Sequence, residues 1–490
     1  MADNPSSTPA ARAVVLLIAG GVVARGVFAA TTGLGVDETY MVAVGRHWEL
    51  GYFDHPPLAW WLAHAAAALA GSEADWVVRA PFIALFAVST WLMFRLGALL
   101  FGKTAGLIAA LALNAAPVLG VTTGTWVLPD GPLDASLLAA ALCLAQALLV
   151  PKAPPTLWLA AGLFGGLALL SKFHGVFLFF GAGLFLLTSA PHRGWLARPW
   201  PYLGALVALV IASPGIVWNI DHHWASLAFQ GARAAARVFR PWMPFVALAG
   251  QAVFLAPWIW APLAWAGWRD LRRGPADPRS WLLVCLAAGP ILLFTLAPAW
   301  SDQRPYFHWA APGWMMLLPL LGRAMAPAIE AGSARGRLWL KASLAFDLVA
   351  VAGLVAVSLA PVLLSPFGPA DPLAEMADWS GVGPYLSTQP PAGFVVARRW
   401  YEAAKIDHAL AGRLDVICLG DDCRGYDFIA PDHPLAGGDA TIFLPENALA
   451  ALPVIAARFE RVEPMPDLTI TRGPLTVARL KVFRGVKFGN

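Results

Sequence analysis

Residues 156–189 read TLWLAAGLFGGLALLSKFHGVFLFFGAGLFLLTS, two apolar runs on either side of the short turn Ser171-Lys172-Phe173. We expect the runs 156–171 and 174–189 to be helices, each near the lower limit of length for crossing about 30 Å of hydrocarbon. A charged side chain is costly inside the hydrocarbon layer, so Lys172 should lie at a membrane face. The stretch therefore predicts a pair of transmembrane helices with a charged site at the turn between them.

The composition of the whole chain supports this interpretation. The 490 residues are 58% hydrophobic and only 13% charged, with a mean hydropathy of +0.62. Soluble proteins carry about 25% charged residues, so an ordinary soluble enzyme is excluded. The 23 Trp residues suit two interfacial belts. Runs of Lys and Arg that would indicate a nucleic-acid partner are absent from the sequence. We therefore predict an all-α polytopic membrane protein.

The apolar runs predict eleven spans and a transmembrane domain over residues 1–364. The spans are residues 11–31, 76–100, 104–122, 131–150, 156–171, 174–189, 200–218, 244–267, 280–298, 308–326 and 339–364. Residues 32–75 form an outer loop between the first two spans. In that loop we expect a short amphipathic helix over 37–50 and an interfacial helix over 58–69, which is too short to cross.

Residues 365–490 change in character, because Pro, Gly and charged residues return. We expect a small α/β domain outside the membrane, with a helix over 400–410. Its short strands are predicted over 394–397, 416–418 and 440–444. Cys418 and Cys423 are close enough in sequence to form a disulfide there.

The Lys and Arg residues of the short connections predict the orientation, because cytoplasmic loops carry the excess of cations. One set of connections holds Arg12, Lys103, Lys152, Arg193, Arg198, Arg269, Arg272, Arg273, Arg279, Arg335, Arg337 and Lys341. This set predicts the cytoplasmic face of a bacterial inner membrane. An odd number of spans then places residues 365–490, and the candidate site, on the periplasmic side.

Two adjacent carboxylates, Asp37 and Glu38, follow the first span. A carboxylate near an acceptor hydroxyl can remove its proton as a new bond forms, which makes both residues candidate catalytic bases. The alternative is structural, since acids are favoured at the start of a helix. Both roles are compatible, because a cap fixes the position of the carboxylate.

Cations on the same face predict a phosphate site. The ammonium of Lys172 suits a lipid phosphate, and the guanidinium of Arg304 can hold phosphate oxygens in bidentate fashion. His55 and Tyr306 are further candidate donors to that phosphate. The alternatives are a Lys that extends toward the interface and aromatic residues of the membrane belt.

Other polar residues of this face are candidate substrate ligands. They are Asp54, Asp130, His174, His308, Asn219 and Arg233. Asp130 has the alternative role of capping the span that follows it. The adjacent residues His222 and His223 would not face one metal ion on a helix. We therefore assign no metal ligands; a divalent metal cofactor is left open but is not required. The sequence has no nucleotide-binding loop.

Several of these segments resemble, in the same order, those of the family 39 and 83 glycosyltransferases, which include the protein O-mannosyltransferases and the lipid A aminoarabinose transferases. The segments are Asp37-Glu38-Thr39-Tyr40, Gly51-Tyr52-Phe53-Asp54-His55-Pro56-Pro57-Leu58, Leu128-Pro129-Asp130-Gly131-Pro132, Leu169-Leu170-Ser171-Lys172 and Arg304-Pro305-Tyr306-Phe307-His308-Trp309. The resemblance covers roughly residues 11–330. It implies the membrane fold called GT-C and a polyprenyl-phosphate sugar donor. It also implies Asp37 as the catalytic carboxylate and a donor phosphate held by Lys172 and Arg304. His55 stands where the aminoarabinose transferases carry a lysine.

The residues and the resemblance together predict an inverting glycosyltransferase. It would move one hexosyl or pentosyl group from a polyprenyl phosphate to a lipid, glycan or protein acceptor at the outer face of the inner membrane. The leaving group is already a phosphate, so the site needs a base and cations rather than a strong acid. The alternative is a transporter or flippase of lipid-linked sugars, which predicts inverted repeats and charges near the bilayer midplane.

Overall fold

The computed structural model describes residues 9–232, 238–302, 304–367, 373–431 and 433–489. The chain forms two compact units. The first comprises Met1–Gly26, Leu50–Ala59 and Ala80–Val351, and the second comprises Val27–Glu49, Trp60–Arg79 and Ala352–Asn490. The predicted division between residues 364 and 365 stays a prediction. In the structure, residues of the outer loop fold together with the C-terminal part of the chain.

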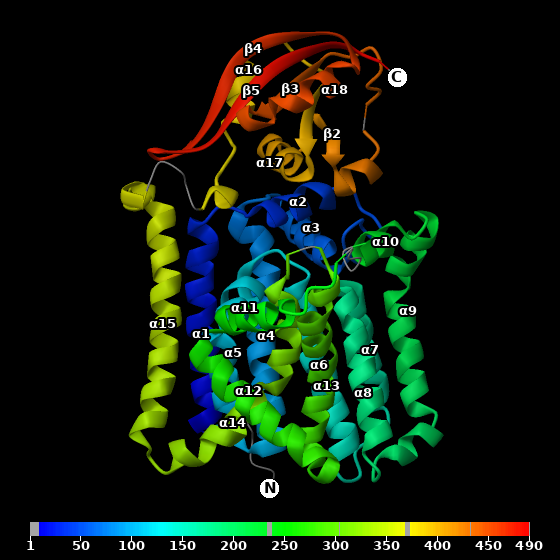
Figure 1. The fold of residues 1–490 in the computed structure, drawn as a ribbon, viewed down its shortest axis with the longest axis vertical. Helices are drawn as coiled ribbons and strands as arrows, with labels where there is room; N and C mark the ends of the chain where they lie inside the picture. Colours follow the sequence, from blue (N-terminus) through cyan, green and yellow to red (C-terminus); the bar gives the residue numbers. More distant parts are fainter. Residues whose placement is uncertain (1–8, 233–237, 303, 368–372, 432, 490) are drawn as a thin grey trace. The chain divides into compact units, whose positions relative to one another are not determined.

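Helices make up the first unit (Figure 1). They are α1 (Pro9–Thr31), α4 (Asp75–Phe101), α5 (Lys103–Ala115), α6 (Asp130–Leu149), α7 (Leu157–Ser171), α8 (Val176–Thr188), α9 (Trp200–Asp221), α10 (Ala225–Ala232), α11 (Met243–Leu255), α12 (Pro257–Arg273), α13 (Pro278–Leu296), α14 (Ala311–Glu330) and α15 (Ala334–Leu359). The α1, α4 and α15 helices extend into the second unit. Buried apolar side chains of α4 to α8 and α12 to α14 form one continuous core.

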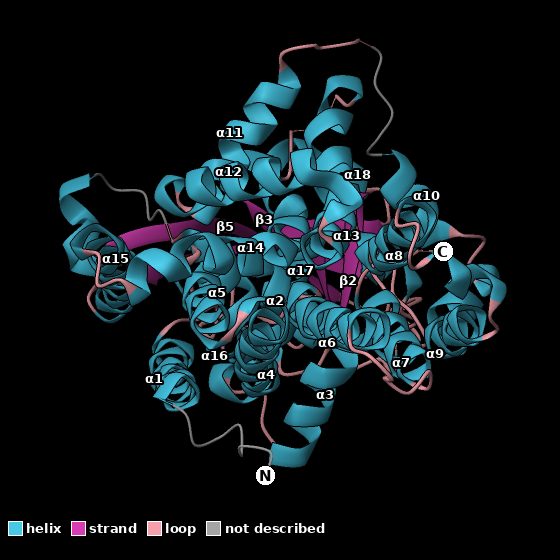
Figure 2. Cartoon of the chain, turned by 90° about the horizontal axis from the view of Figure 1, so that it is seen from below, coloured by secondary structure: helices cyan, strands magenta, loops and turns pink. Residues whose placement is uncertain are grey.

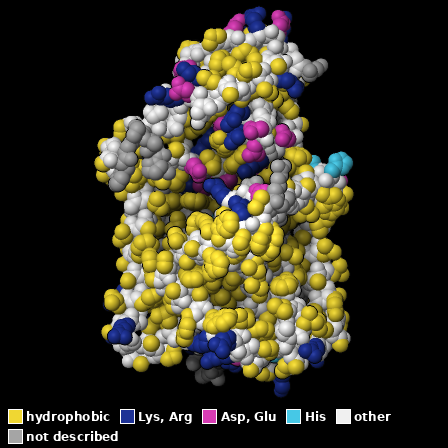
Figure 3. All heavy atoms as spheres, viewed as in Figure 1, with side chains coloured by type: hydrophobic (Ala, Val, Ile, Leu, Met, Phe, Trp, Pro, Cys, Tyr) yellow, Lys and Arg dark blue, Asp and Glu magenta, His cyan; other side chains and the backbone are white. Residues whose placement is uncertain are grey.

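The surface of these helices is apolar, as a lipid environment requires (Figure 3). Six helices in the described part of the chain are long and apolar enough to cross a membrane, or seven if the bent pair α11 and α12 counts as one span. The six are α1, α4, α6, α9, α13 with the turn that follows it, and α15. A multi-pass membrane protein is thus confirmed, but the count of eleven spans is not.

Two of the predicted spans are interrupted helices in the structure. Residues 244–267 bend by 117° between α11 and α12. The bend lies at Ala256, whose φ of +70° is a left-handed conformation, and Pro257 cannot continue the hydrogen-bond pattern of α11. Residues 104–122 break at Ala116, which is extended because Pro117 follows, and continue as the π-helical segment Val118–Thr123.

Glycines allow α7 to pack closely on α9. Figure 2, which looks along the helices, shows α7 between α6 and α9. A methyl group on Gly162 would lie 2.1 Å from Gly204 O, and one on Gly166 would lie 2.9 Å from Ala208 O. Two glycines four residues apart therefore let the backbones approach, as they commonly do between membrane helices.

The second unit contains a five-stranded sheet of order β2-β1-β3-β5-β4. The strands are β1 (Phe394–Arg399), β2 (Asp415–Asp422), β3 (Ala440–Pro445), β4 (Phe459–Arg472) and β5 (Leu475–Phe488). The first three pair in parallel, and the other pairs are antiparallel. The helices are α2 (Val36–Gly45), α3 (Leu58–Ala70), α16 (Val382–Ser387), α17 (Trp400–Leu410) and α18 (Leu452–Ala456).

The predicted α/β character, the three predicted strands and the helix over 400–410 are confirmed. The β4–β5 hairpin was missed, because Pro464, Pro466 and interspersed charges obscure the alternation of β4. Cys418 and Cys423 form a disulfide, with their Cα atoms 5.5 Å apart.

An ionic network joins the outer loop to α17 within the second unit. The Arg46 guanidinium donates to both carboxylate oxygens of Glu73, at 2.7 and 2.6 Å, and to Asp407 Oδ1 at 2.5 Å. Nearby, Lys405 Nζ donates to Leu34 O at 2.7 Å and to Ala377 O at 3.0 Å. These contacts tie residues far apart in sequence into one folded body.

The Glu73 ion pair predicts a pH-dependent contribution to stability. Burial raises the pKa of Glu73, but the hydrogen bonds from Arg46 and the charges of Arg46 and His408 outweigh burial and lower the pKa to about 2 from its ordinary 4.5. The stabilisation is therefore complete above pH 4.5 and is lost as the pH falls toward 2. We expect Glu73→Gln to lower the free energy of unfolding at pH 7 by about 1.5–3 kcal/mol.

Thermal unfolding of the detergent-solubilised protein at pH 7 and pH 3 measures this effect. The deficit of Glu73→Gln should be smaller at pH 3. The matched control is Glu463→Gln, which removes an exposed surface ion pair with Arg461 and should have little effect. An equal deficit at both pH values would contradict the prediction.

Candidate functional site

A cavity of about 320 Å³ in the first unit is lined by all four predicted phosphate ligands. We call it the Lys172 cavity. It lies at the turn between α7 and α8, next to the end of α13 and the loop that follows. The polar part of its wall contains His55, Lys172, His174, Arg304 and Tyr306. The apolar part contains Phe173, Phe177, Leu227, Leu293 and Phe294. The structure thus brings Lys172, Arg304, His55 and Tyr306 to one place, although their proposed role stays a prediction.

Lys172 is held by a buried ion pair. The residue ends α7 in an extended conformation, with φ −157° and ψ 145°. Its Nζ lies 2.9 Å from each carboxylate oxygen of Asp130, the first residue of α6. Both residues are buried. The Asp130 carboxylate therefore fixes the position of the Lys172 ammonium and neutralises its charge.

A second carboxylate lies one helical turn further along α6 and was not predicted. Asp134 is only 3% exposed. Its Oδ1 has no hydrogen-bond partner among the described residues. The signal was in the sequence, because Asp134 is an ionisable residue inside the predicted span 131–150.

Aromatic rings order the rest of the wall. The His174 ring stacks on Phe294, with centroids 4.7 Å apart, and meets Trp309 edge-on at 5.8 Å. Tyr306 stacks on Trp309 at 4.6 Å, and the Arg304 guanidinium lies 5.9 Å from the Tyr306 ring. Arg304 is exposed, so its charge is available to a ligand in the cavity.

The other predicted ligands are not in this wall. Asp54 is buried, and its backbone oxygen accepts a hydrogen bond from Gln230 at 2.6 Å. Asn219 is buried in the last turn of α9 and donates to Gly215 O at 2.9 Å. His308 follows Tyr306 in the same loop, with its ring 6.4 Å from Trp309. Arg233 lies outside the described residues.

The two candidate bases lie in the second unit and differ in environment. Glu38 is 1% exposed and pairs with Arg79, with Oε2 2.6 Å from Nη2 and Oε1 2.8 Å from Nε. Glu38 also accepts the Gly35 N–H at 2.8 Å. Asp37 is exposed in the first turn of α2. Glu38 is thus committed to structural contacts, and Asp37 presents its carboxylate at the surface of its unit.

Arg79 was missed by sequence reasoning, although it too is a charge inside a predicted span. It is fully buried and also donates to Thr32 O at 2.7 Å and Gly33 O at 2.8 Å. This anchor fixes the turn that leads into α2. Among the described residues, no three His, Cys, Asp or Glu side chains come together as metal ligands.

The arrangement of membrane helices followed by a small α/β unit is the GT-C fold of membrane glycosyltransferases. The crystal structure of ArnT from Cupriavidus metallidurans superposes with a TM-score of 0.67 over 97% of this chain and 98% of that chain, at 15% identity. The structure of the same protein bound to undecaprenyl phosphate gives a TM-score of 0.65, also at 15% identity, over 96% and 97% of the two chains. These likenesses confirm the predicted fold.

Sequence comparisons point the same way. Residues 54–218 match the family described as dolichyl-phosphate-mannose-protein mannosyltransferase. The lipid A galacturonosyltransferase RgtD of Rhizobium johnstonii is 27% identical over 309 residues, which is 58% of this chain and 59% of the relative. The chain thus spans under two thirds of the length of that relative. The resemblance to GT-C glycosyltransferases of the family 39 and 83 type is confirmed.

The buried pair of Lys172 and Asp130 should be strongly coupled in stability. Removing one partner leaves an uncompensated buried charge, which costs about 3–5 kcal/mol. We expect Asp130→Asn and Lys172→Met each to lower the melting temperature markedly. The double variant should lose much less than the sum of the two. Thermal unfolding of the four purified proteins completes the double-mutant cycle, and strictly additive losses would contradict the ion pair.

Proposed function

We propose that the protein is an inverting glycosyltransferase that uses a polyprenyl-phosphate sugar as donor. The Lys172 cavity is the observation that carries the proposal, because it joins a cationic end to an apolar wall. A polyprenyl phosphate has the same two parts, a charged head group and a hydrocarbon chain. The relatives support the choice, since ArnT has been crystallised with undecaprenyl phosphate and RgtD is a lipid A galacturonosyltransferase.

In the proposed reaction, Asp37 removes the proton of an acceptor hydroxyl while its oxygen bonds to the anomeric carbon of the sugar. The bond from that carbon to the phosphate oxygen breaks, and the polyprenyl phosphate departs with the electron pair. Lys172 and Arg304 then stabilise the developing phosphate charge. Tyr306, His55 and His174 position the head group. The acceptor is a lipid, glycan or protein at the outer face of the inner membrane.

The Lys172–Asp130 pair gives the phosphate site a specific property. In the ligand-free protein, the Asp130 carboxylate pairs with the Lys172 ammonium, so this buried positive charge needs no counterion from solvent. A donor phosphate would share Lys172 with Asp130 and would add its charge next to that carboxylate. Arg304, which lies at the same cavity and is exposed, supplies the second positive charge that makes this binding favourable.

Asp37→Asn tests the base. The amide cannot accept the acceptor proton, so transfer should fall by roughly 10²-fold or more, with donor binding and melting temperature unchanged. The assay follows release of polyprenyl phosphate from a lipid-linked sugar by purified protein. Asp467→Asn, an exposed aspartate of the same unit, is the control and should retain activity. Near-normal turnover of Asp37→Asn would remove the base role from this residue.

Arg304→Ala tests the phosphate ligands. A charge-assisted hydrogen bond contributes about 1.5–3 kcal/mol, so binding of a short-chain polyprenyl phosphate should weaken about tenfold to a hundredfold. The loss should not add to that of Lys172→Ala, because both residues share one ligand. Arg193→Ala, in the turn after α8, is the control. Unchanged polyprenyl-phosphate binding by Arg304→Ala would contradict the proposed phosphate site. Binding of the lipid-linked sugar by the unaltered protein without transfer to any acceptor would favour the transporter function.

A further inference from the structure

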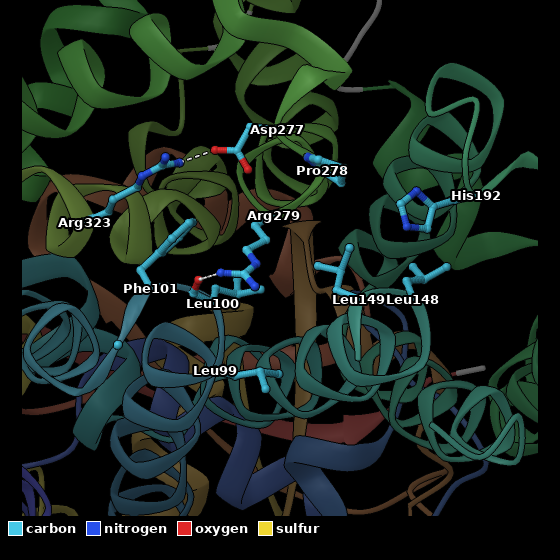
Figure 4. Close-up of a pocket in the computed structure, with 11 residues that line it drawn as sticks. Leu99, Leu100, Phe101, Leu148, Leu149, His192, Asp277, Pro278, Arg279 and Arg323 are labelled. Atoms are coloured by element: carbon cyan, nitrogen blue, oxygen red, sulfur yellow. Dashed lines mark hydrogen bonds and ion pairs between the residues drawn. The ribbon is translucent and has the colours of Figure 1, made fainter. Parts of the chain in front are cut away.

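A second cavity of about 750 Å³ lies in the first unit at the other end of its helices. Its wall includes Arg279, Arg323, Asp277 and His192 (Figure 4). We call it the Arg279 cavity. The α13 helix connects the two cavities, because Arg279 lies in its first turn and Leu293 and Phe294 in its last. A helix of 19 residues spans about 28 Å. The two cavities therefore lie at opposite faces of the membrane.

The charges of the Arg279 cavity leave one guanidinium available. Arg323 is engaged, since it pairs with Asp277, donates to Ser280 Oγ at 2.5 Å and covers the Phe101 ring at 5.0 Å. Figure 4 shows Arg279 pointing toward Leu100. Among the described residues, the Arg279 side chain donates a single hydrogen bond, to Leu100 O at 3.3 Å. Arg279 is exposed and lines the cavity, so its guanidinium is accessible to a ligand.

The rest of the wall adds no negative charge beyond Asp277. His192 Nδ1 lies 2.8 Å from Ser189 Oγ. Burial lowers the pKa of His192, so the ring is neutral at pH 7. Two arginines and one aspartate leave the cavity with a net charge of +1. A monoanionic ligand would balance it.

The remaining wall is apolar and belongs to the ends of membrane helices. Leu99 lies in the last turns of α4, and Leu148 and Leu149 end α6. Figure 3 shows Lys and Arg side chains gathered at the lower end of these helices. Basic pockets between helix ends suit the head groups of anionic lipids.

We propose that the Arg279 cavity binds the phosphodiester of an anionic phospholipid, with Arg279 as its bidentate ligand and Leu148 and Leu149 against the glycerol end. The proposal is independent of the transferase reaction, because neither the Lys172 cavity nor Asp37 takes part in it. The bound lipid would hold the ends of α4, α6 and α13 together at the face opposite the donor site.

Native mass spectrometry of the full chain in detergent tests this, with short-chain phosphatidylglycerol and phosphatidylcholine as probes. We expect phosphatidylglycerol to be retained in preference to the zwitterionic lipid. Arg279→Gln should weaken phosphatidylglycerol binding about tenfold or more, the effect of a charge-assisted hydrogen bond. The matched control is Arg272→Gln, an exposed arginine in the last turn of α12 that does not line the cavity; it should bind like the unaltered protein.

Three outcomes would overturn the proposal. Arg279→Gln could retain phosphatidylglycerol as well as the unaltered protein does. Phosphatidylcholine could bind as tightly as phosphatidylglycerol, which would remove the charge argument. Inorganic phosphate could displace phosphatidylglycerol at equal concentration, which would identify a soluble phosphate rather than a lipid as the ligand. Arg279 is exposed, so its replacement should leave the fold intact, and the melting temperature checks this.

Discussion

The cost of a charge in hydrocarbon governs this structure, and the contact between Lys172 and Asp130 shows how the chain meets it. An ammonium at the end of an apolar helix must find a counterion within the protein or reach water. Here the first residue of α6, Asp130, supplies the carboxylate that pairs with Lys172 at the end of α7. The ion pair therefore joins the two helices at the point where their apolar runs stop. The Lys172 cavity forms around that junction. The rings of Phe294, His174, Trp309 and Tyr306 contact one another in the wall of this cavity.

The same constraint explains which features could be predicted from the sequence. Apolar runs with charged turns predict membrane helices, because a water-soluble fold could not bury so many apolar residues away from water. The cations and carboxylates next to the apolar runs were identified as candidates, because a charged side chain near the hydrocarbon layer usually has a structural or functional role. Pro257 gave no sign of the 117° bend, since many membrane helices tolerate proline. The left-handed Ala256 that completes the corner has no sequence signal, because alanine rarely adopts that conformation.

Charges inside the apolar runs were the overlooked signal. Arg25 donates to Gly120 O at 2.9 and 2.6 Å and lies over the Phe86 ring at 4.2 Å, so it holds the π-helical segment. Arg79 secures the turn before α2, and Asp134 is buried within α6. None of the three was assigned a role, although an ionisable residue at membrane depth usually has one. Pairing partners far apart in sequence, such as Arg79 with Glu38, cannot be identified without the fold.

Photoaffinity mapping tests the central claim most directly, namely that the Lys172 cavity holds a polyprenyl phosphate. A short-chain polyprenyl phosphate with a diazirine in its first isoprene units is irradiated with the purified protein, and the labelled peptides are sequenced. The account predicts labels in Phe173–Phe177 and in Leu293 to Trp309, with competition by unlabelled polyprenyl phosphate. Labels confined to Leu99–Gly102 and Asp277–Arg279, or labels that unlabelled lipid does not compete away, would contradict it.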